Sequence, residues 1–97
     1  MKQPDREHIS TLEELPNIGR AISQRLRLIG ITHPRQLIGK QAFALHQDLC
    51  EKTGEQIDPC VIDVFMSAID FMEGGEARPW WRYTSKRKMI EQGRHDY

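Results

Sequence analysis

Apolar residues recur at every third or fourth position over much of the chain, which is the spacing of a helix with one buried face. The clearest stripe predicts a helix over residues 19–29; its apolar members are Ile18, Ile22, Leu26 and Ile29. Gly30 follows as the left-handed residue that commonly ends a helix. The opposite side of this helix carries Arg20, Gln24 and Arg27, which we expect to face solvent or a ligand.

Start and stop signals predict four further helices, over residues 11–14, 34–38, 41–53 and 59–73. Ser10 and Glu13 are spaced as a capping box for the first of them. Thr32 is placed to cap the second, while Gly39 and Gly54 are placed to end the second and the third. Strand patterns are scarce, so the sequence predicts an all-α fold of five short helices.

The helix over residues 59–73 is expected to be the most buried. Asp58 followed by proline is a strong start signal. Apolar residues cover most of its circumference: Val61, Ile62, Val64, Phe65, Met66, Ala68, Ile69, Phe71 and Met72. Asp63, Ser67 and Asp70, spaced four and three apart, form a thin polar line that we expect to face water.

Beyond Gly75 the chain changes to aromatic and basic residues that are too few to form a core. We expect residues 79–83 to pack back on the helices in extended form, with a mobile end. Trp80 and Trp81 can stack on exposed bases, but a hydrophobic lid on the helices is the favoured interpretation. The predicted organisation is a flexible N-terminus over 1–9, a helical domain over 10–83 and a basic mobile tail over 84–97.

The composition is that of a small soluble protein. A chain of 97 residues has material for one core, and 38% hydrophobic with 29% charged residues is ordinary for a globular domain. No apolar run approaches the ~20 residues that span a bilayer, and the start lacks the apolar segment of a signal peptide. We therefore expect a cytoplasmic protein in which Cys50 and Cys60 are reduced.

The net charge of zero hides a strong sorting of charge along the chain. The net charge is −2 over residues 1–16, +5 over 17–40, −7 over 48–76 and +4 over 78–97. Such asymmetry indicates an anionic partner, although mutual neutralisation of the segments within the fold is an equal alternative. Lys86, Arg87 and Lys88 form a basic run that fits a flexible arm which adds affinity for nucleic acid; a solvated tail without a specific role is an equal alternative.

The stretch LPNIGRAISQRL, residues 15–26, has the pattern of a helix-hairpin-helix motif. Such a turn leaves the amides around Asn17, Ile18 and Gly19 unpaired beside the positive end of the next helix dipole, which makes an anion site. Gly19 lets a phosphate approach because it has no side chain. Asn17 tolerates a positive φ, and Ile18 is expected to plug the core.

Phosphate contacts of this kind position a protein on DNA without reading its sequence. The predicted nucleic-acid-binding residues are Pro16, Asn17, Ile18, Gly19, Arg20, Arg27, Lys86, Arg87 and Lys88. The structural alternative is a hairpin whose glycine only permits close packing. The helices over 41–53 and 59–73 can form a second, degenerate hairpin, which gives a tandem helix-hairpin-helix (SAM-like) domain with an extended C-terminal tail.

The chain resembles a family of small bacterial proteins known as pathogenicity-locus proteins, sometimes labelled mitomycin-resistance-like. The resemblance is carried by LPNIGRAISQRLRLIGI, ALHQDLCEKTGEQIDPCVIDVFMSAIDF and PWWRYT. It implies a helix-hairpin-helix fold and a link to DNA, and it supplies no catalytic residues. The first half is also similar to the carboxy-terminal domain of competence regulators of the TfoX type, which implies the same fold.

No metal, cofactor or enzymatic activity is predicted. His46 and Cys50 are four apart on one helix face, but zinc requires four ligands, usually in short-spaced pairs, and the sequence has no C-x-x-C. No nucleophile, base and orienting group fall in a recognisable arrangement. We expect a non-enzymatic domain that binds duplex DNA independently of sequence. The alternative is a module that recruits a DNA-processing protein, and a small enzyme or drug-sequestering protein is a third.

Overall fold

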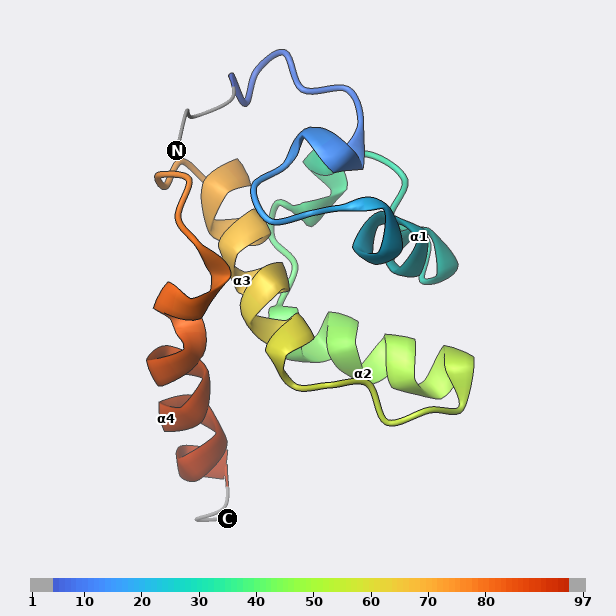
Figure 1. The fold of residues 1–97 in the computed structure, drawn as a ribbon, viewed down its shortest axis with the longest axis vertical. Helices are drawn as coiled ribbons and strands as arrows, with labels where there is room; N and C mark the ends of the chain where they lie inside the picture. Colours follow the sequence, from blue (N-terminus) through green and yellow to red (C-terminus); the bar gives the residue numbers. More distant parts are fainter. Residues whose placement is uncertain (1–4, 95–97) are drawn as a thin grey trace.

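The computed structural model describes residues 5–94, apart from the side chain of Arg94, and its regular elements are all helical (Figure 1). The α-helices are α1 (Arg20–Leu28), α2 (Ala42–Thr53), α3 (Cys60–Met72) and α4 (Thr84–Arg94). Three short 3₁₀ helices complete the fold: η1 (Leu12–Glu14) before α1, η2 (Pro34–Leu37) between α1 and α2, and η3 (Trp80–Tyr83) before α4. The described part of the chain contains no strand, so the prediction of an all-α fold is confirmed.

Helix α3 lies in the middle of the molecule, with α1 and α2 on one side and α4 on the other in Figure 1. The side chains of Phe65, Ala68 and Phe71 on α3 are fully buried. They pack with Leu12, Leu26, Leu37 and Leu49, one from each of the surrounding elements η1, α1, η2 and α2. The prediction that this helix is the most buried one is confirmed.

The helix ends follow the local signals closely. Gly30 adopts a φ of +88°, and the amide of Ile31 donates to the carbonyl of Leu26 over 2.9 Å. This bond and the burial of both side chains form a Schellman motif, which explains why Gly30 and Ile31 stand at this distance behind Leu26. At the start of α3, the carboxylate of Asp58 accepts the amide of Cys60 over 2.8 Å.

Two of the predicted helix caps are wrong. At η1 the hydroxyls of Ser10 and Thr11 both donate to the carboxylate of Glu14, and no side chain caps the backbone. At η2 the cap is His33, whose Nδ1 accepts the amide of Arg35, and Gln36 completes the capping box. A residue before proline favours the extended conformation that a cap residue needs. His33 has this position and Thr32 does not.

The polar line on α3 does not face water. Asp63 and Ser67 are buried, and Asp70 is half-buried. The hydroxyl of Thr84 and Nε of Arg87 each donate to the Asp63 carboxylate over 2.6 Å. A buried carboxylate is stable only when it is paired, and the C-terminal segment supplies its partners.

Both ends of the described chain differ from the expectation. Residues 80–83 form the 3₁₀ helix η3 instead of an extended segment, and residues 84–94 form α4, which packs against α3. In the N-terminal segment Ile9 is buried, and Arg6 donates to the carbonyls of Phe71 and Gly75 over 2.9 and 2.6 Å. The segments expected to be flexible therefore contact the helical core. Residues 1–4 and 95–97 lie outside the described range.

Candidate nucleic-acid interface

The hairpin before α1 is a tight turn over residues 15–18. The amide of Ile18 donates to the carbonyl of Leu15 over 3.3 Å, and Asn17 has a φ of +66°. Proline followed by a residue with positive φ is the pattern of a type II turn, and asparagine tolerates that conformation better than most residues. The predicted role of Asn17 in the turn is confirmed, whereas the amide of Ile18 is bonded within the turn instead of unpaired.

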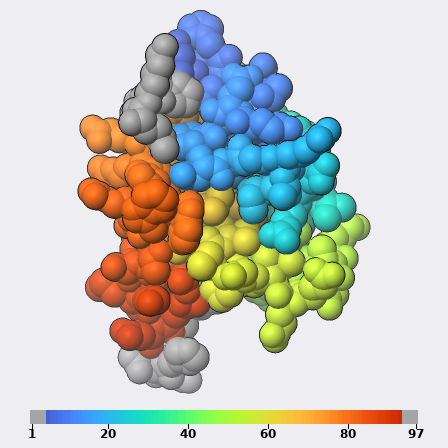
Figure 2. Space-filling view, viewed as in Figure 1, coloured from blue at the N-terminus to red at the C-terminus, as the bar shows by residue number. Residues whose placement is uncertain are grey.

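Asn17 also fixes the hairpin to distant parts of the chain. Its Nδ2 donates to the hydroxyl of Ser67 on α3 over 3.1 Å and to the carbonyl of Arg78 over 2.7 Å. In Figure 2 the residues around 17 (blue) touch those around 78 (orange) on one face of the molecule. Pro16 and Ile18 are buried. One side of the hairpin is therefore anchored in the core.

The other side of the hairpin is open. Gly19 is exposed, has a φ of −97°, and has no atom within 4 Å of the position where a Cβ would stand. It is the N-cap of α1 and provides no side-chain hydrogen bond to the first turn. The first amides of an α-helix have no partner within the helix. They remain accessible here because glycine leaves the space in front of them open.

Arg20 is the first residue of α1 and is exposed. A cation at this position is unfavourable for the helix, because the N-terminus carries the positive end of the helix dipole. The first turn contains no acid that would offset it. A cation that stands at the positive end of a helix dipole, with no acid to offset it, is more typical of a functional position than of a structural one. An anion bound here would satisfy both the open amides and Arg20.

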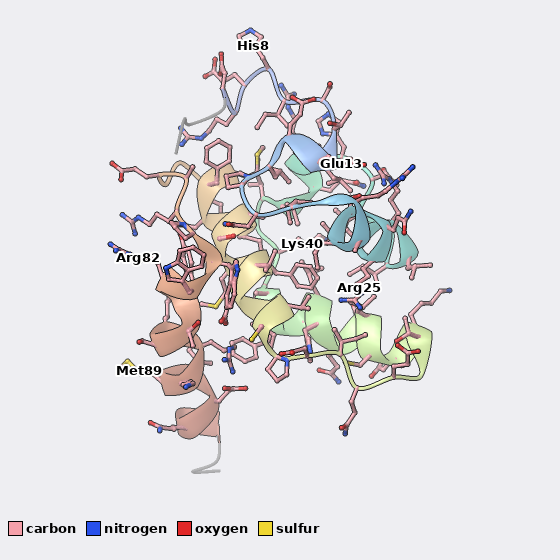
Figure 3. All side chains as sticks on the ribbon, in the orientation of Figure 1. His8, Glu13, Arg25, Lys40, Arg82 and Met89 are labelled. Atoms are coloured by element: carbon pink, nitrogen blue, oxygen red, sulfur yellow. The ribbon has the colours of Figure 1, made fainter. Side chains whose placement is uncertain are left out.

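Arg27 is committed to an internal ion pair. Its Nη2 lies 3.1 Å from a carboxylate oxygen of Glu13, which Figure 3 labels beside α1, and its Nη1 donates to the hydroxyl of Ser23. Both charged side chains are about half exposed. The pair neutralises much of the charge that Arg27 would offer to a phosphate, so we assign it a minor role at most.

Lys86, Arg87 and Lys88 of α4 separate into two groups. Lys86 and Lys88 are exposed. Arg87 is 7% exposed and donates to the carboxylates of Asp63 and Glu91 over 2.6 and 2.8 Å. Its guanidinium therefore holds α4 on α3 and is not presented to a ligand, contrary to the expectation of a freely basic arm.

The C-terminal segment forms a second link to α3 through Tyr83. Its hydroxyl donates to Oδ2 of Asp70 over 2.7 Å. Burial, followed by the bond to Asp70, raises the pKa of Tyr83 from 10.0 to about 12. Because both effects favour the protonated phenol, this residue stabilises the fold only while it is protonated.

We expect the stability of the protein to fall between pH 10 and pH 12 in a way that depends on Tyr83. The unfolded chain loses the phenolic proton first, so the contribution is complete below pH 10 and disappears as the pH rises through the folded pKa. The slope for one proton is at most about 1.4 kcal/mol per pH unit. Urea unfolding across this range, compared with Tyr83→Phe, measures it; equal slopes in the two proteins would contradict the assignment.

The anchoring function of the polar line on α3 was not predicted from the sequence. The available signal was Asp63, Ser67 and Asp70 at helical spacing on an otherwise apolar helix, a pattern that indicates buried partners as well as it indicates solvent. The difference between the two tryptophans was not predicted either. Trp80 packs against the core, as a lid would, whereas Trp81 is 61% exposed.

Four further observations concern metal ligands, thiols, membrane-spanning helices and cavities in the described residues. Within residues 5–94, no three histidine, cysteine, aspartate or glutamate side chains are grouped so that they can hold a metal ion. Cys50 and Cys60 are free thiols. No helix in the described range is long and apolar enough to cross a membrane. A cavity of about 150 Å³ lies between α3 and the C-terminal segment, lined by Lys40, Asp70, Glu73, Tyr83 and Lys86 among others.

The fold and the hairpin define a small all-helical protein whose basic helix α1 begins at an open turn without a side-chain cap. The chain belongs to the pathogenicity locus family: the family model Cdd1, described as "Pathogenicity locus", matches residues 5–89. It is also similar to "Mitomycin resistance protein McrB" of Streptomyces lavendulae, with 41% identity over 88 residues that cover 90% of this chain and 84% of the relative. The comparison with solved structures gave no match.

Proposed function

We propose that this protein is a non-enzymatic DNA-binding domain that holds backbone phosphates at the hairpin, independently of base sequence. The observation that carries the proposal is the start of α1, where exposed Gly19 leaves the first amides open and Arg20 adds an exposed cation. In this proposal the turn is a helix-hairpin-helix motif, and Lys86 and Lys88 are auxiliary contacts. Pro16 and Ile18 pack the turn against the core, and the hydrogen bonds of Asn17 to Ser67 and Arg78 hold it in place.

We expect Gly19→Glu to lower DNA affinity more than tenfold, because it places a carboxylate where the phosphate would lie. The fold tolerates the change, since the space around Gly19 is open and its φ is ordinary. An acid is also favourable at a helix N-terminus. Arg20→Ala is expected to reduce the slope of log affinity against log salt by about one. Fluorescence anisotropy with a labelled duplex over a series of salt concentrations measures both effects.

Gly19→Ala is the matched control, because it adds a Cβ but no charge; the Cβ obstructs part of the phosphate site, so its affinity is expected to lie between those of the wild type and Gly19→Glu. Non-specific binding of this class has a Kd of about 10⁻⁴ to 10⁻⁶ M at physiological salt. Unchanged binding in both Gly19→Glu and Arg20→Ala would remove the hairpin from the mechanism. Failure of the wild type to bind DNA even at low salt would favour the alternative, a module that recruits a partner protein.

The printed name of the Streptomyces relative concerns resistance to mitomycin. We propose that this chain contributes to such resistance through the same DNA contact. Survival of cells exposed to mitomycin, scored with the wild type, Gly19→Ala and Gly19→Glu, extends the binding experiment to the cell. Protection that is lost only in Gly19→Glu would connect DNA binding at the hairpin with resistance to mitomycin.

A further inference from the structure

Trp81 is a large aromatic side chain that the fold leaves in solvent. It is 61% exposed, whereas its neighbour Trp80 packs against the core. The two indoles meet edge to face, with centroids 5.8 Å apart and an angle of 83° between the ring planes. Such a contact covers at most one face of either ring. Trp80 therefore braces Trp81 from the core side and leaves ring surface of Trp81 uncovered.

The segment of the chain that carries Trp81 is positively charged. No acidic residue occurs between positions 77 and 90, and Arg78, Arg82 and Lys86 are all exposed. Figure 3 shows Arg82 at the outer edge of this segment. An exposed aromatic ring among cations is the combination that proteins use for single-stranded nucleic acid, because the cations follow the backbone and the ring stacks on a base. An apolar docking site for a protein would not require these charges.

Trp81 is also tied to the phosphate site of the hairpin. Nδ2 of Asn17 donates to the carbonyl of Arg78 over 2.7 Å, and Trp81 follows Arg78 by only three residues. Three residues span at most about 11 Å even when fully extended, and the last two of these three belong to η3. The ring therefore lies within a few nucleotides of any phosphate held at Gly19 and Arg20.

We propose that Trp81 stacks on an unpaired base of the DNA strand whose phosphate lies at the hairpin. The ligand that fits this arrangement is DNA with single-stranded nucleotides next to a duplex. This inference rests on the proposed function, because the hairpin supplies the phosphate contact. It adds to that function the structure of DNA that the protein prefers. Neither stacking nor phosphate contact reads base sequence, so the preference is for an unpaired base of any kind.

The test compares three ligands by fluorescence anisotropy: a blunt duplex, the same duplex with a short single-stranded overhang, and that duplex with an overhang of abasic nucleotides. The wild type is expected to prefer the overhang that carries bases. Trp81→Ala should weaken binding to that overhang by about 5- to 150-fold, the range for one stacked base, and leave the blunt duplex within about twofold. Trp81→Phe keeps a ring and should retain most of the affinity. Binding of the base-carrying overhang should also quench tryptophan fluorescence.

Trp81→Ala is expected to fold, because its side chain is mostly in solvent, and thermal unfolding checks this. Equal binding of the wild type to the two overhangs, or no effect of Trp81→Ala, would overturn the stacking proposal. If Gly19→Glu still weakened binding to all three ligands, the proposed phosphate contact would stand without the stacking contact. If Trp81→Ala changed only self-association or the capture of a protein, the ring would belong to a protein interface and the proposal would fall. If the wild type bound none of the three ligands, both the phosphate contact and the stacking of Trp81 would be ruled out.

Discussion

Asp63→Ala is expected to lower the free energy of unfolding by about 3 kcal/mol or more. Asp63 is fully buried, and its carboxylate accepts hydrogen bonds from Arg87 and Thr84. Removal of the acid leaves a guanidinium at 9% side-chain exposure with Glu91 as its remaining ion-pair partner. A buried charge that loses its buried partner costs more than the pair contributes, and Glu91, which is more exposed, compensates only in part, so the contact between α4 and α3 should weaken. Urea unfolding followed by circular dichroism measures the loss.

Two variants test the reason for this loss. Glu91→Ala removes only the outer partner of Arg87, which lies four residues away on the same helix, and should cost less than about 1 kcal/mol. The double substitution Asp63→Ala with Arg87→Met removes both buried charges and should be more stable than Asp63→Ala alone. A loss below about 1 kcal/mol in Asp63→Ala would show that the pair is solvated in solution.

Phe65→Ala is expected to cost about 3–5 kcal/mol, the range for deleting a buried aromatic ring. Phe65 is fully buried in the middle of α3, where the surrounding helices meet. A domain of this size is stable by roughly 5–15 kcal/mol, so the substitution removes a large share of that stability. The melting temperature, measured by circular dichroism, should fall by more than about 10 °C.

Phe65→Leu is the control for this substitution, because it keeps most of the apolar volume and should cost about 1 kcal/mol. Similar losses in the two variants would contradict the view that a cavity causes the effect. Neither variant alters the exposed rim of the hairpin. DNA binding by folded Phe65→Leu is therefore expected to match the wild type.

The parts of the fold that were predictable from the sequence are those set by neighbouring residues. Gly30, Gly54 and Asp58 each mark a helix end through backbone conformation or a bond to a residue close by, and the structure places the ends there. Phe65 could be assigned to the core because the apolar residues around it leave no other face to bury. The positive φ of Asn17 follows in the same way from its position after proline in a turn.

The parts that the sequence did not predict depend on partners far along the chain. Whether Asp63 faces water or a cation is decided by Arg87, 24 residues later, and the pattern of α3 alone does not contain that information. Arg87 was accordingly assigned to a solvated arm, because its two lysine neighbours suggested a uniform basic segment. The candidate site shows the same limit, since periodicity identified Gly19 and Arg20 but did not place Trp81 near them.

The double hydrogen bond of Asn17 also has a consequence for the order in which the protein assembles. Its partners lie 50 and 61 residues further along the chain. During synthesis the hairpin therefore leaves the ribosome well before Ser67 and Arg78, and α1 can form while the turn ahead of it is still unsupported. The rim at Gly19 and Arg20 reaches its final shape only after both Ser67 and Arg78 have left the ribosome and can contact Asn17. A nascent chain thus carries the basic helix before it carries a finished interface.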